Sequence, residues 1–154
     1  MIAKILTKKN VTYAAYTVGG LLVAKKIFDY FKSTSKQTLK DVETEVVELE
    51  KAGMQPSRSL GQWKLVADSI YNSMKFSYMS DNKSNIEEQL KMVKNDLDLA
   101  LLVKAYGLRQ HYTFAIPDGN RTTLIGQIAT GELSNSRLKS INNNYAQKGI
   151  TYRF

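Results

Sequence analysis

The clearest pattern along the chain is an uncharged, largely apolar run over residues 10–24 with lysines on both sides. Fifteen residues make about 22 Å of α-helix at ~1.5 Å per residue, against a hydrocarbon thickness of ~30 Å. Flanking lysines can lengthen the span by lifting their ammonium groups to the interface, where aromatic residues also sit well. The run predicts a membrane-spanning or interfacial anchor helix within residues 1–33. The predicted lipid-contacting residues are Lys8, Lys9, Tyr13, Tyr16, Val18, Gly19, Gly20, Leu21, Leu22, Val23, Lys25 and Lys26.

Two other interpretations of this N-terminal segment stay open. A helix buried in a soluble assembly would also lack charge, and fifteen residues are short for a bilayer span. A cleaved signal peptide also starts with basic residues and an apolar run, but Lys25 and Lys26 stand where a small-residue cleavage site is expected. Lysines at both ends leave the orientation across a membrane open.

A second helix is predicted within residues 34–53, where apolar residues recur at alternating three- and four-residue spacing. It could pair with a copy of itself, dock on a neighbouring subunit or pack on its own domain. Fewer than two heptads are too short for a stable isolated coiled coil, which favours a stalk docked on a neighbour. Its predicted partner-contacting stripe consists of Leu39, Val42, Val46 and Leu49.

A linker over residues 54–61, which contain a proline, two serines and a glycine, leads to the predicted globular domain over residues 62–154. Apolar residues at helical spacing predict a first helix directly after the linker. Ser84 with Glu87 matches a capping box and predicts the start of the second helix. The third is expected to begin at Asp96, and its nearly continuous apolar surface predicts a central position.

Residues 108–121 are predicted to form a long connection after this third helix. Tyr112, Phe114 and Ile116 alternate with other residues there, and Pro117–Gly119 carries a turn signature. Two short helices follow, and the apolar last five residues are expected to pack back on the domain. The expected fold class is therefore all-α, with an anchor helix, an amphipathic stalk and a compact bundle of about five short helices.

The distribution of charge changes the functional interpretation. A net charge of +8 and a pI of about 9.6 by themselves suggest a nucleic-acid partner. However, residues 1–40 carry eight lysines against one aspartate, whereas residues 41–53 carry five acids against one lysine. Because most of the excess charge brackets the uncharged run, the distribution favours anionic lipid over nucleic acid. A basic-aromatic loop could stack on nucleotides or contact a subunit, and it consists of Arg109, His111, Tyr112, Phe114 and Arg121. We favour contact with a subunit, through Arg109, Tyr112 and Phe114.

Few residues are suited to catalysis or metal binding. The chain has no cysteine, which excludes disulfides, thiolate zinc sites and a cysteine nucleophile. His111 is the only histidine, and its local sequence supplies neither a positioned carboxylate nor a nucleophile. Phosphate-loop, dinucleotide-binding and HExxH motifs are missing from the sequence. We therefore predict no enzyme activity, no cofactor and no metal.

Three motifs within residues 70–145 stand out, which are SDNKSNIEEQL at 80–90, LALLVKAYG at 99–107 and GELS at 131–134. With these motifs the segment resembles a degenerate annexin-type repeat. With its Asn-rich last helix and aromatic tail, the arrangement also resembles small domains of bacteriophage virion proteins. The resemblance implies a helical protein-packing module beside a membrane. Calcium binding is not carried over, because the loop at 78–83 has a lysine and no glycine.

These patterns predict a membrane-anchored structural protein that ties a lipid bilayer to neighbouring protein subunits. By resemblance, the setting would be a phage virion with a membrane. The expected partners are the lipid bilayer and other structural subunits, including copies of the chain. A basic nucleic-acid-binding accessory protein and a cellular inner-membrane structural protein remain as alternatives, so the expected location is a virion membrane or a bacterial inner membrane.

Overall fold

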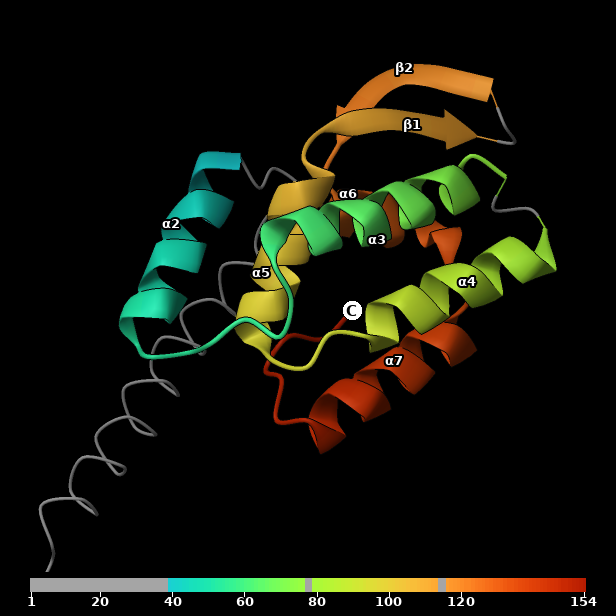
Figure 1. The fold of residues 1–154 in the computed structure, drawn as a ribbon. Helices are drawn as coiled ribbons and strands as arrows, with labels where there is room; N and C mark the ends of the chain where they lie inside the picture. Colours follow the sequence, from blue (N-terminus) through green and yellow to red (C-terminus); the bar gives the residue numbers. More distant parts are fainter. Residues whose placement is uncertain (1–38, 77–78, 114–115) are drawn as a thin grey trace, which may run out of the picture.

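A computed structural model of the chain describes residues 39–76, 79–113 and 116–154 (Figure 1). The predicted anchor segment lies outside these residues. Six α-helices, one π-helix and one antiparallel pair of strands follow each other within the described part. Their bounds are α2 (Leu39–Lys51), α3 (Leu60–Met74), α4 (Ser80–Lys91), α5 (Asp96–Tyr106), β1 (Arg109–Thr113), β2 (Ile116–Thr122), α6 (Leu124–Gln127), the π-helix η1 (Ile128–Glu132) and α7 (Asn135–Gln147).

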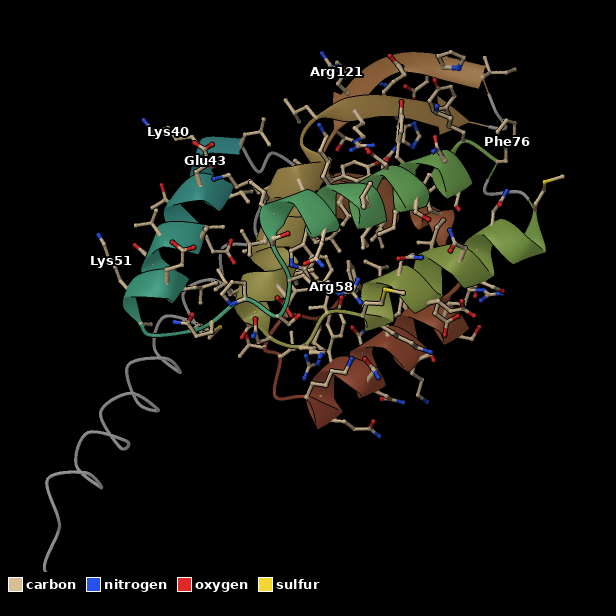
Figure 2. All side chains as sticks on the ribbon, in the orientation of Figure 1. Lys40, Glu43, Lys51, Arg58, Phe76 and Arg121 are labelled. Carbon is tan, nitrogen blue, oxygen red and sulfur yellow. The ribbon has the colours of Figure 1, made fainter. Side chains whose placement is uncertain are left out.

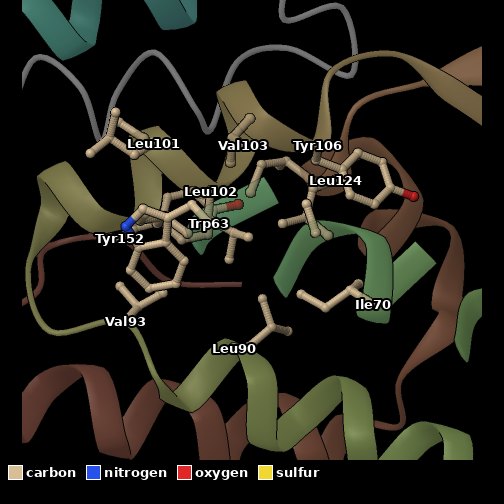
Figure 3. Close-up of a cluster of buried hydrophobic side chains, with 14 of the residues drawn as sticks. Trp63, Ile70, Leu90, Val93, Leu101, Leu102, Val103, Tyr106, Leu124 and Tyr152 are labelled. Atoms are coloured by element: carbon tan, nitrogen blue, oxygen red, sulfur yellow. The ribbon is translucent and has the colours of Figure 1, made fainter. Parts of the chain in front are cut away.

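Helix α5 lies at the centre of the helical part, as its apolar surface predicts. It packs against α2 on one side and α3 on the other, while α4 bridges α3 and α7 (Figure 1). Trp63 of α3, Leu90 of α4 and Leu102 of α5 are fully buried in the shared core (Figure 3). The mostly helical fold is therefore confirmed, and α5 is the element around which the others are arranged.

Helix α2 is part of this domain, which corrects its interpretation as a stalk docked on a neighbour. Val42, Val46 and Leu49 are buried and belong to the same apolar core as α3 and α5. The short connection to α3 lets α2 fold back on α5. The apolar stripe of α2 is then buried within the same chain, and no second molecule is needed to cover it. Leu39, at the start of the stripe, stays 37% exposed.

The expectation of an all-α fold is wrong for residues 109–122, which form a β-hairpin. Thr113 pairs with Ile116, so the Pro117–Gly119 segment lies inside β2 and does not reverse the chain. Between the pairs Gln110–Arg121 and Tyr112–Pro117, β1 has one residue and β2 has three. The residues of the turn signature therefore form a bulge in β2, where Gly119 has a φ of 86°.

One predicted helix start matches the observed one and another differs from it. Helix α5 begins at Asp96 as expected, and it is capped by Asn95, whose side-chain oxygen accepts from the amide of Asp98. Helix α4 already starts at Ser80, so Ser84 lies within it and is not a cap. A capping box instead starts α3, where Ser59 and Gln62 exchange hydrogen bonds.

The C-terminal residues pack back on the domain, as their apolar character predicts. Ile150 and Tyr152 are buried, and the amide of Phe154 donates to the side chain of Asn142 at 2.9 Å. Asp96 accepts hydrogen bonds from the amide and hydroxyl of Thr151. The tail is thereby joined to both α5 and α7.

Candidate functional site

The predicted anchor residues lie outside the described residues, so their role stays a prediction. They are Lys8, Lys9, Tyr13, Tyr16, Val18, Gly19, Gly20, Leu21, Leu22, Val23, Lys25 and Lys26. Within residues 39–76, 79–113 and 116–154, the helices all fall short of the length and apolar character that a bilayer crossing needs.

The predicted contact residue Arg109 is engaged inside the chain. Its guanidinium donates to the carboxylate of Asp68 at 2.6 Å and to the carbonyl of Tyr106 at 2.7 Å. The same group lies 4.9 Å from the ring centre of Tyr71 and 4.8 Å from that of Tyr106. Since two rings and a carboxylate already surround it, Arg109 joins β1 to α3 and α5. This corrects its assignment to a partner.

Tyr112 belongs to the same internal cluster. Its ring centre lies 6.1 Å from that of Tyr71, and Lys75 Nζ lies 4.7 Å from the Tyr71 ring. Burial and the Tyr112 hydroxyl raise the pKa of Tyr71, which keeps its phenol neutral among the cations. Phe114, the third predicted member of the basic-aromatic loop, lies outside the described residues.

A second cluster surrounds His111 and was missed in the sequence. The imidazole Nδ1 contacts the carboxylate of Asp118, and Nε2 lies 3.1 Å from the hydroxyl of Thr130. Glu132 Oε1 is 3.7 Å from the same Nε2. The four side chains come from β1, the bulge of β2 and η1, so only folding brings them together. The local signal in the sequence was the turn signature at Pro117–Gly119. In the structure this segment forms the bulge of β2, which places Asp118 opposite His111.

The contacts of this cluster lie between the hairpin and η1. The Thr130 hydroxyl donates to the carbonyl of Gln127 at 2.6 Å, and its oxygen lies 3.1 Å from Nε2 of His111. Nδ1 of the same ring contacts the carboxylate of Asp118 in the bulge of β2. The imidazole therefore joins the hairpin to η1 through its two ring nitrogens.

The electrostatics around the bulge agree with this assignment. The Asn120 amide, 2.9 Å from Asp118 Oδ1, and the His111 ring lower the pKa of Asp118. The carboxylate therefore stays ionised at neutral pH, where it lies against Nδ1 of the imidazole. Within the described part of the chain, groups of three or more histidine, aspartate or glutamate side chains suited to a metal ion do not occur.

An open groove of about 450 Å³ lies between α2, α3 and α5. Glu43 and Lys104 face each other at 3.9 Å in this groove, the outer limit of an ion pair. Leu39 is exposed at this groove, and its role in contacting a partner stays a prediction. The lining consists of Leu39, Glu43, Leu60, Gly61, Lys64, Lys104 and Ala105.

Two carboxylates in the first turn of α5 have separate structural roles. Asp98 is fully buried and accepts from the hydroxyl and the amide of Ser57 at 2.6 and 2.8 Å. Asp96 holds the C-terminal tail through Thr151. Each satisfies backbone donors of an irregular segment next to α5, so both contribute to the fold.

The comparisons with known proteins leave the family open. No protein-family model matches this chain, and the comparisons with curated proteins and with solved structures found no match. The resemblance to annexin-type repeats and virion domains therefore stays a prediction.

Proposed function

We propose that this chain is a membrane-anchored structural protein that ties a lipid bilayer to neighbouring protein subunits. The observation that carries the proposal is the uncharged run at residues 10–24, bracketed by lysines at both ends. Each lysine near an anionic headgroup contributes about 1 kcal/mol of attraction, and the apolar run supplies the burial in lipid. The protein then couples the two mechanically, through an anchor joined to a packed helical domain.

The described domain supports a role in contact rather than in chemistry. Its histidine contacts Asp118 and Thr130 through its two ring nitrogens, and its buried aspartates hold irregular backbone segments. The cation of Arg109 is enclosed by Tyr71, Tyr106 and Asp68, which leaves little of this cluster for stacking on nucleotides. These contacts disfavour the nucleic-acid alternative. By resemblance, we propose a phage virion as the setting, with a cellular inner membrane as the alternative.

Flotation with liposomes tests this proposal. The full chain is compared with Leu22→Arg, which places a charge in the middle of the apolar run, and with Ile116→Arg. Ile116 is exposed on β2, so its variant controls for an added arginine on the domain. We expect the wild type and Ile116→Arg to float with anionic vesicles. Leu22→Arg is expected to lose about tenfold or more in partitioning, since a central arginine costs a few kcal/mol.

Two outcomes would contradict the proposal. If the wild-type chain stays in the dense fraction, it has no membrane anchor. If Leu22→Arg floats as well as the wild type, the apolar run does not insert into the membrane. Retardation of DNA by the full chain, with a steep dependence on salt and without lipid binding, would support the nucleic-acid alternative instead.

A further inference from the structure

The groove between α2, α3 and α5 has exposed leucines along its rim. Leu39 begins α2 and is 37% exposed, and Leu60 begins α3 and is 45% exposed. Leu65 stands one turn after Gly61 on the same side of α3 and is 72% exposed. Leu39, Leu60 and Gly61 line the groove. Apolar side chains are therefore gathered here in water, where a contact with another surface would bury them.

The groove and its rim carry more positive than negative charge. Glu43 and Lys104 lie 3.9 Å apart in the groove and largely offset each other. Lys64 also lines the groove and is exposed, and within the described part of the chain it makes no ion pair. The same holds for Lys40 at the start of α2 (Figure 2). Three lysines against one glutamate give this face a net charge of +2.

The other acids of α2 and α3 change this balance little. At ~100° per residue, Asp41 and Glu48 stand roughly 160° and 140° around the helix axis from Glu43, on the far flank of α2. Glu50 is on the groove side but about 10 Å further along the axis than Glu43, beyond the Debye length of about 8 Å at physiological salt. On α3, the carboxylate of Asp68 is already paired with a guanidinium at 2.6 Å. The positive face is therefore the one around the start of α2.

The groove is also close to the predicted anchor along the chain. The predicted anchor ends at residue 33, and six Cα–Cα steps lead from there to Leu39. At no more than ~3.6 Å each, these steps hold Leu39 within about 22 Å of that point. Phe76, another exposed apolar residue, lies on the side of the domain away from α2 (Figure 2). Of these two apolar surfaces, the groove is the one that the chain holds near the membrane.

We infer that this face of the domain lies against the anionic membrane surface that the anchor enters. The leucines then reach the boundary between headgroups and acyl chains, and the lysines lie at the level of the lipid phosphates. The inference rests on the proposed function, because it names the side of the domain that the bilayer covers. Helix α7, which lies away from the start of α2, is then turned away from the membrane (Figure 1). The face consists of Leu39, Lys40, Leu60, Lys64 and Leu65.

Fluorescence quenching on vesicles tests this orientation in the full chain. The chain has no cysteine of its own, so Gly61→Cys supplies a single thiol for a fluorescent label. Outside its own helix backbone, a Cβ at Gly61 would meet only Ser59 Oγ, at an ordinary 3.9 Å, so the position accepts a side chain. The matched control is Asn143→Cys, an exposed position on α7 that carries the same label.

The vesicles contain phosphatidylcholine and phosphatidylserine, with a quencher attached to some of the headgroups. We expect the quencher to lower the emission of the label on Gly61→Cys by about half or more, because that label lies at headgroup depth. The label on Asn143→Cys is expected to keep its emission, since α7 stays in water.

Charge reversal in the groove tests the electrostatic part of the contact. In the Gly61→Cys background, Lys64→Glu replaces a cation at headgroup level by an anion, which is expected to weaken the docked orientation about fivefold or more. Quenching then falls while flotation is kept, because the anchor is unchanged. Lys139→Glu, an exposed reversal on α7, changes the net charge equally and should leave the quenching unaltered. Raised salt should act in the same direction as Lys64→Glu.

The results separate this inference from the proposed function. If the chain floats but the labels on Gly61→Cys and Asn143→Cys are quenched equally or not at all, the inference is overturned while the anchor stands. A groove that stays in water on a floating chain is then a surface for an acidic protein partner. Quenching that survives Lys64→Glu unchanged also overturns the inference. A chain that does not float rejects the proposed function, and this inference with it.

Discussion

At the scale of single residues, Glu45 is the group through which pH acts most strongly on the described domain. It lies on the buried side of α2 with Val46 and Leu49. Burial, with the nearby carboxylates of Asp96 and Glu48, raises its pKa from 4.5 to about 8. The folded protein therefore keeps Glu45 protonated at neutral pH, whereas the unfolded chain does not.

The sign of the resulting pH dependence follows from proton binding. Between pH 4.5 and about 8, the folded state holds a proton that the unfolded state has lost, so stability falls as pH rises through this window. Glu45→Gln removes this titration. We expect it to match the wild type near pH 4.5 and to gain stability steadily towards pH 8, by at most about 5 kcal/mol.

Urea unfolding at pH 5, 6.5 and 8 measures this gain. Glu50→Gln, an exposed change on the same helix, is the control and is expected to stay within ~0.5 kcal/mol of the wild type. If Glu45→Gln and the wild type lose stability in parallel as pH rises, Glu45 is ionised in the folded state and its assignment is wrong.

At the scale of elements, the hairpin is held to the helical part at two places. Arg109 joins the start of β1 to α3 and α5, and His111 joins its middle to η1. A two-stranded hairpin is marginally stable in water by itself, so these contacts decide whether it stays ordered. The bulge opposite His111 matters because it brings Asp118 to the imidazole.

Removal of the imidazole is therefore expected to act locally. In His111→Ala, amide hydrogen exchange over β1 and β2 should become about tenfold faster, since two side-chain hydrogen bonds are lost. The amides of α5 should keep their protection. Ile116→Ala, an exposed change on the same hairpin, should leave exchange close to the wild type. Equal acceleration in both variants would show that the His111 contacts do not hold the hairpin.

At the scale of the whole molecule, α2 is a structural part of the domain. Leu49 is fully buried, and its helix packs on α5. Leu49→Ala is expected to cost about 2–5 kcal/mol of unfolding free energy, the range for a large apolar side chain removed from a core. Leu65→Ala, at a position that is 72% exposed, should cost less than ~0.5 kcal/mol. Thermal and urea unfolding of the full chain measure the free energy of unfolding of both variants. If Leu49→Ala loses as little stability as Leu65→Ala, α2 does not pack on the domain and is a separate stalk.

Much of the helical architecture could be predicted because its signals are local. The apolar surface of α5 and the return of the tail through Ile150 are both visible within a few residues of sequence. One helix start was harder to predict, because Ser84 resembles a cap but stands inside its helix. Short polar side chains suit several positions near a helix start, and packing decides among them.

The candidate sites were harder to predict because their members are far apart in sequence. Arg109 meets Asp68 across 41 residues and His111 meets Thr130 across 19. A basic-aromatic loop has the same composition whether its cations face solvent or stack on its own tyrosines. Composition therefore singled out Arg109 and Tyr112, but it could not show that both residues contact Tyr71 of α3 inside the chain.

The sequence by itself determined where helices form, where the charge is concentrated and which chemistry is excluded by the lack of cysteine, because these depend on residue type and spacing along the chain. Only the tertiary structure decided which molecule covers the apolar stripe of α2. The stripe at Val42 and Val46 needs burial of any kind, and α5 lies close enough to supply it. Burial there turns the opposite side of α2, which includes the half-exposed Val47, towards solvent.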